Sequence, residues 1–105
     1  MSDMCKIAAF YHFTELPDYD AWAECMVEHG LKVGLRGTLI FAPEGVNSTC
    51  AGSPKAIDAT IALLQSDARF EGISVKYSYA DFNPFPKFKV KKKPEIVTFR
   101  QEGAD

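Results

Sequence analysis

Hydrophobic residues change their spacing along this chain in a way that predicts alternating strands and helices. Lys6 to Phe13 is apolar and aromatic without a clear period, which indicates a central strand buried on both faces. From Asp18 the apolar residues repeat at helical spacing, and Gly30 or Gly34 ends this helix. Its apolar face holds Tyr19, Trp22, Ala23, Met26, Val27 and Gly30, and the opposite face is acidic.

The middle of the chain reads as two strands joined by a tight turn. Thr38 to Ala42 has the β-branched and aromatic composition of a strand, and a second short run covers Ser48 to Ala51. Between them, Gly45 follows Pro43 and Glu44 and is free to take a positive φ. Ser53 then predicts the N-cap of a second helix, which runs from Pro54 to about Ala68.

The remaining residues predict further strands. Ile73 to Tyr79 alternates, with Ile73, Val75, Tyr77 and Tyr79 on one face. After a turn-rich aromatic segment at 81–86, Phe88 to Lys93 alternates lysine with apolar residues, and Glu95 to Phe99 is a last short strand. The order β-α-β-β-α-β predicts an α+β, ferredoxin-like domain over residues 1–99, with both helices on one face of an antiparallel sheet and a short C-terminal β extension. Residues 100–105 are interpreted as the start of a linker.

Composition adds few constraints. A chain of 105 residues with 47% hydrophobic and 25% charged residues fits one globular domain. Three unclustered cysteines indicate free thiols in a reducing cytoplasm, and no apolar run approaches the roughly 20 residues of a membrane span.

Charge is distributed unevenly beneath a net value of −2. Residues 1–29 carry one base against six acids, whereas five lysines fall within residues 87–93: Lys87, Lys89, Lys91, Lys92 and Lys93. If this segment is extended, alternate lysines share one face, near Phe85 and Phe88. Cations and aromatic rings together suit the binding of unpaired RNA. An edge strand whose lysines prevent aggregation explains the same pattern equally well.

Other chemistry-bearing residues favour structural interpretations. Cys25 and His29 are one helical turn apart and could supply two metal ligands. A zinc site needs three or four converging ligands, so a structural role for both residues is the better explanation. Cys50 precedes a helix N-terminus, a position that lowers the pKa of a thiol and could make it reactive. A packing role as an apolar residue of the strand is the better explanation. Glu44 and Asn47 flank the turn, where solvated turn residues are common. We therefore expect no catalytic residue, metal or cofactor in this domain.

The same element order occurs in acylphosphatases, whose chemistry needs a loop that binds phosphate after the first strand. A glycine-rich, arginine-bearing loop would be expected there. In this chain the loop is Thr14-Glu-Leu-Pro-Asp18, which is acidic. We therefore reject acylphosphatase activity.

Three segments resemble the N-terminal domain of the rhodanese-related tRNA uridine hydroxylases. They are the aromatic opening Ala8–Thr14, the Gly37–Asn47 segment with its Ala-Pro-Glu-Gly-Val-Asn ending, and residues 83–97 with a basic strand followed by Glu-Ile-Val. The resemblance spans nearly the whole chain. Ser48, where the family has a small residue such as glycine, and Pro94, inside the basic strand, depart from it.

The resemblance implies a cytoplasmic enzyme that hydroxylates the wobble uridine of tRNA to 5-hydroxyuridine with oxygen. It also implies a rhodanese domain beyond Asp105 that holds the essential cysteine, so this domain is expected to be non-catalytic and to help hold tRNA. The expected RNA contacts are Lys87, Lys89, Lys91, Lys92, Lys93, Arg36, Phe85 and Phe88. The alternatives are a docking module that orients the rhodanese domain without binding RNA, and part of a sulfurtransferase. Exposure of Tyr11, Tyr77 and Tyr79 beside the lysines would favour RNA.

Overall fold

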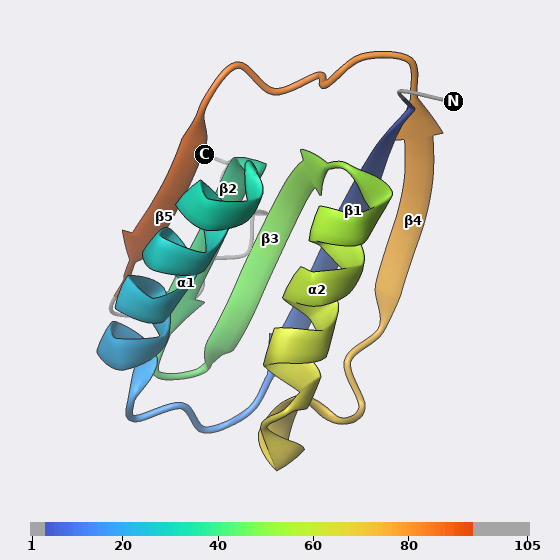
Figure 1. The fold of residues 1–105 in the computed structure, drawn as a ribbon. Helices are drawn as coiled ribbons and strands as arrows, with labels where there is room; N and C mark the ends of the chain where they lie inside the picture. The colour runs from blue at the N-terminus through green and yellow to red at the C-terminus, as the bar shows by residue number, and fades with distance from the viewer. Residues whose placement is uncertain (1–3, 94–105) are drawn as a thin grey trace, which may run out of the picture.

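A computed structural model describes residues 4–93, which form one sheet with two helices packed against it (Figure 1). The strand order β4-β1-β3-β2, with every neighbouring pair antiparallel, is that of a ferredoxin-like sheet, so the expected fold is confirmed. In chain order the elements are β1 (Cys5–Phe13), α1 (Tyr19–Val33), β2 (Arg36–Ala42), β3 (Gly45–Gly52), α2 (Pro54–Gln65), a 3₁₀ turn (Ala68–Phe70), β4 (Val75–Ala80) and β5 (Phe88–Lys92).

The predicted C-terminal β extension is present as β5, which pairs in parallel with the outer strand β2. To reach it, residues 81–87 cross from the β4 edge of the sheet to the opposite edge, over the end of the sheet (Figure 1). Four strand spacings amount to about 19 Å, which seven residues can cross with some bending because they reach about 23–25 Å when fully extended. The predicted strand Glu95–Phe99 and the linker at 100–105 lie outside the described residues.

The core lies between the helices and one face of the sheet. Phe10, Leu39 and Phe41 project from the strands into this layer, where they meet Met26 of α1 and Leu64 of α2. The expectation that β1 is buried on both faces is wrong, because both helices cover the same face. On the other face of β1, Tyr11 and Phe13 are each 57% exposed.

The element ends follow the local sequence signals. The Ser53 hydroxyl accepts a hydrogen bond from the Ala56 amide, as expected for an N-cap. Gly34, with φ 79°, ends α1, whereas Gly30 lies inside that helix. Gly45 has φ 141°, and a Cβ there would lie 2.0 Å from the carbonyl oxygen of His12, so the turn requires glycine.

Candidate nucleic-acid interface

Strand register assigns each side chain to one face of the sheet, because directly paired residues project to the same side. We call the side away from α1 and α2 the open face. One row across it reads Lys76, Ala9, Thr49, Thr38 and Lys89, and the next reads Tyr11, Asn47, Ile40 and Lys91. Apart from Ile40, the middle of the open face is therefore small or polar; the first row ends in a lysine at both edges and the second at the β5 edge.

The lysine run is divided between the two faces. Lys89 and Lys91 lie on the open face, opposite Thr38 and Ile40 of β2. Lys92 projects to the helix side, where its Nζ lies 3.6 Å from an Asp20 carboxylate oxygen. It is therefore positioned as part of the helix layer rather than of the open face.

The two flanking lysines are fixed through their main chains. The Lys87 carbonyl accepts a hydrogen bond from the Gly37 amide, and the Lys93 amide donates to the Phe41 carbonyl. Both side chains are exposed. Lys87 and Lys93 thus lie at the two ends of β5, where they bracket Lys89 and Lys91.

Of the two aromatic residues expected to support RNA binding, Phe88 projects away from the open face. Phe88 points to the helix side, and a Cβ on Gly30 would lie 2.1 Å from its ring, so the ring packs against α1. Phe85 is half-buried in the crossing segment, where its amide donates to the Asn83 side chain. Phe88 is a packing residue, and we leave it out of the interface.

Arg36 lies on the open face. It is exposed at the start of β2 and pairs with Ala51, and the same row continues to Ile7 of β1. It therefore adds a guanidinium to the end of the open face that also holds Lys89.

Sequence reasoning missed Lys76 and Phe13. The alternation in β4 separated Lys76 from the tyrosines correctly, but the pattern did not show which of the two faces the helices cover. Phe13 belongs to the aromatic segment Lys6–Phe13, for which the sequence predicts burial on both faces. The signal that identifies both is the register of β1 with its neighbours.

Charges are separated between the two sides of the molecule. The strand residues assigned to the open face include four cations and, within residues 4–93, no acid: Arg36, Lys76, Lys89 and Lys91. The outer surface of α1 instead carries exposed acids, Asp20, Glu24 and Glu28. The uneven charge along the sequence thus becomes a difference between two sides of the fold, and the positive side suits an anionic ligand.

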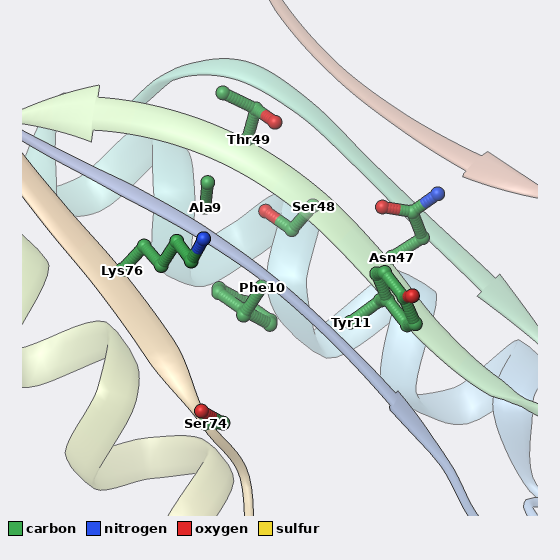
Figure 2. A pocket seen from close by; sticks show the side chains of 8 residues that line it. All are labelled: Ala9, Phe10, Tyr11, Asn47, Ser48, Thr49, Ser74 and Lys76. Atoms are coloured by element: carbon green, nitrogen blue, oxygen red, sulfur yellow. The ribbon is translucent and has the colours of Figure 1, made fainter. Parts of the chain in front are cut away.

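A hollow of about 430 Å³ lies on the open face where β4, β1 and β3 adjoin (Figure 2). Its lining includes Lys76 and Ser74 on one side and Tyr11, Asn47 and Thr49 on the other. Figure 2 shows the Lys76 side chain extending from β4 toward β1, and Tyr11 beside Asn47. The hollow thus combines an aromatic ring, an ammonium group and uncharged polar groups.

The tyrosines of β4 lie on the other side of the sheet. Tyr77 and Tyr79 share a face with Lys6, whose Nζ lies 4.4 Å and 6.0 Å from the two ring centroids. The same Nζ is 2.8 Å from an Asp58 carboxylate oxygen of α2, and this hydrogen bond raises the pKa of Lys6. Both tyrosines are exposed, yet of the three tyrosines only Tyr11 shares the open face with the lysines.

The candidate nucleophile and metal ligands occupy structural positions. Cys50 is fully buried on the helix side of β3, and burial raises the pKa of its thiol, the opposite of what a nucleophile needs. The His29 Nε2 lies 2.9 Å from the Thr60 hydroxyl oxygen, which bridges α1 to α2. Burial lowers the pKa of His29. Within residues 4–93, no three His, Cys, Asp or Glu side chains gather as a metal site.

The loop after β1 binds the hairpin turn instead of presenting free amides. The Thr14 amide donates to the Glu44 carbonyl, and the Leu16 amide donates to the Pro43 carbonyl. Asp18, at the end of this loop, pairs with Arg69. These contacts explain why an acylphosphatase-like fold has no phosphate-binding loop at this point.

Among curated proteins, the chain is similar to several with the name tRNA uridine(34) hydroxylase. It is 42% identical to that of Nitrobacter winogradskyi over 97% of this chain and 42% of the relative. Identity is 43% to that of Xylella fastidiosa, over 89% and 36%, and 46% to that of Bordetella avium, over 85% and 37%. The chain thus spans about two fifths of the length of these relatives.

Solved structures share the fold at low sequence identity. The BLUF protein BlrB, in its dark state, superposes with a TM-score of 0.69 at 17% identity, over all of this chain and 82% of that one. BlrP1 BLUF gives a TM-score of 0.65 at 17% identity, over 85% and 63%. At these identities the likeness concerns the arrangement of helices and strands.

None of the helices within residues 4–93 is long and apolar enough to cross a membrane. The family model described as "UPF0176 acylphosphatase like domain" matches residues 5–96, which is most of the chain. This match and the curated relatives confirm the kinship indicated by the three sequence segments. The chain belongs to the UPF0176 acylphosphatase-like domain family.

Proposed function

We propose that this domain holds tRNA on its open face, as the N-terminal part of an enzyme that hydroxylates the wobble uridine of tRNA in the cytoplasm. The observation that carries the proposal is the charge of that face, which has four cations and no acid among its described strand residues. Cations track RNA phosphates, and strands that present no carboxylate on this face avoid repelling them. The names of the curated relatives supply the substrate class.

The hydroxylation itself is assigned to a rhodanese domain beyond this chain. The curated relatives are more than twice as long as the segment they share with it, which leaves room for another domain. In the present domain, Cys5 and Cys50 are buried, burial raises the pKa of the Cys50 thiol, and the exposed Cys25 lies on α1, away from the open face. The domain would therefore position tRNA for chemistry performed by its neighbour.

Salt-dependent binding tests the proposal directly. The affinity of this chain for an unmodified anticodon stem-loop is measured at several salt concentrations for the wild type and for Lys89→Gln/Lys91→Gln. The logarithmic salt slope should fall by about 0.7 to 0.9 for each lysine–phosphate interaction that the substitutions remove. Lys92→Gln is the matched control, because Lys92 lies on the same strand but on the helix side.

An unchanged affinity and slope in the double variant would overturn the proposal. The domain would then be better explained as a docking module for the rhodanese domain. Equal losses of affinity in the double variant and in Lys92→Gln would also count against it, because they would show a general charge effect and no preference for the open face.

A further inference from the structure

We propose that Tyr11 and Phe13 form a platform on which unpaired bases of the tRNA stack, beside the hollow on the open face. This inference rests on the function proposed above and adds the class of nucleotide bound. The lysines alone would hold a double-stranded stem as readily as a loop, since phosphate contacts carry no information on base pairing. The exposed rings favour single-stranded nucleotides.

The two rings have the exposure and arrangement that stacking requires. Tyr11 and Phe13 are two residues apart on β1, so both project to the open face, and each is 57% exposed. Their centroids are 5.5 Å apart, and their planes meet at 72°. In this edge-to-face arrangement the edge of one ring meets one face of the other, so each ring keeps a face that its partner does not cover and against which a flat base can lie.

The surroundings of Tyr11 match a nucleotide better than a purely apolar partner. The hollow of about 430 Å³ is lined by Tyr11 together with the Asn47 amide and the Thr49 hydroxyl, groups that can hydrogen-bond to base edges (Figure 2). Lys76 extends over β1 from one side, and Lys91 ends the row that contains Tyr11 and Asn47. Tyr11 therefore lies between two cations that can serve the phosphates of a stacked nucleotide, whereas Phe13 adjoins Glu15 and Glu44 at the loop end of the face.

The charge of the open face favours RNA over a protein segment as the occupant. A protein segment that covered this face would have to bring carboxylates to four cations, because the described strand residues of the face supply none. An RNA loop brings a phosphate at every nucleotide together with a flat base. Single-stranded RNA therefore satisfies the rings and the cations with one ligand.

The platform is tested with two RNA probes and two sets of variants. The probes are the seven-nucleotide anticodon-loop sequence as a single strand, carrying a 2-aminopurine whose fluorescence reports stacking, and the same sequence in a duplex. Tyr11→Leu and Phe13→Leu keep apolar bulk but remove the ring. Tyr79→Leu is the control, because Tyr79 is nearly as exposed as Tyr11 but lies on the helix side.

The platform predicts that each ring variant weakens single-strand binding by about tenfold. The 2-aminopurine should be less quenched than with the wild type, while the salt slope stays unchanged, since no charge is removed. Tyr79→Leu should bind as the wild type does. Thermal unfolding of every variant confirms that the fold is retained.

The outcomes separate this inference from the proposed function. If the lysine variants lose their salt slope while the ring variants bind normally, the platform is wrong and the phosphate-holding role stands. Tighter binding of the duplex than of the single strand also overturns the platform. A wild-type chain that binds neither probe overturns both proposals, and the apolar rhodanese-docking role becomes the explanation of the exposed rings.

Discussion

The two faces of the sheet are built by the same five strands, yet their side chains are buried to different extents. Along β2, Leu39 and Phe41 are fully buried against the helices, whereas Thr38 and Ile40 between them are half-buried on the open face. Burial of apolar area is the main favourable contribution to folding, so the helix side determines stability. The open face carries little of that contribution, which leaves its residues available for binding.

The two faces also differ in whether their cations lie close to acids. On the helix side, cations meet acids of the helix layer: Lys6 pairs with Asp58, and Lys92 with Asp20. On the open face, Lys76, Lys89 and Arg36 adjoin hydroxyl, alanine and apolar neighbours in their rows. Positive charge held apart from acids is the arrangement expected of a surface that attracts an anionic partner.

The largest expected effect comes from comparing neighbouring residues on the two faces. Phe41→Ala should lower the free energy of unfolding by about 3–5 kcal/mol, because it removes a fully buried ring and leaves a cavity. Ile40→Ala, on the open face, should cost only about 1 kcal/mol. Urea unfolding of both variants measures the difference. Equal costs would mean that the open face is as well packed as the core.

A smaller effect concerns the packing of β5 against α1 at Gly30, on the helix side. Gly30→Ala places a methyl group 2.1 Å from the Phe88 ring, so the ring must move, and we expect the packing of β5 against α1 to weaken. Overpacking costs about 1–3 kcal/mol, partly offset by the better helix propensity of alanine, so we expect a net loss of about 1–2 kcal/mol. Hydrogen exchange of the β5 amides measures this effect, and exchange should be faster in the variant than in the wild type.

The control for this variant is Gly34→Ala. Gly34 has φ 79°, but a Cβ there meets no atom within 4 Å, so the cost is backbone strain of about 1 kcal/mol. The expected control result is a loss of stability similar to that of Gly30→Ala, with amide exchange in β5 unchanged from the wild type. If β5 exchanges equally fast in both variants, the Phe88 contact is not what holds β5 against α1.

Most of the fold was predictable because local signals and the fold agree. The helical stripes, the serine cap at Ser53 and the Gly45 turn each depend on residues near one another in sequence. The site was less predictable because it depends on strand register. Phe88 lies among lysines in the sequence, and its contact with Gly30 appears only once β5 pairs with β2 and lies beneath α1. The row from Lys76 to Lys89 likewise joins residues from five strands.

The smallest expected effect is a pH dependence confined to the helix side. Arg69 donates hydrogen bonds to Asp67 and Asp18, and the pKa of Asp67 is lowered from 3.8 to about 2, chiefly by the hydrogen bond from Arg69. In this pH range the folded chain binds protons less readily than the unfolded chain. The stabilisation that Asp67 contributes is therefore present above about pH 4 and is lost as the pH falls toward 2. In Arg69→Gln, the midpoint of thermal unfolding should vary less with pH between 4 and 2. Lys89→Gln, on the open face, should keep the wild-type profile, and a flattened profile in that variant would contradict the separation of charges between the two faces.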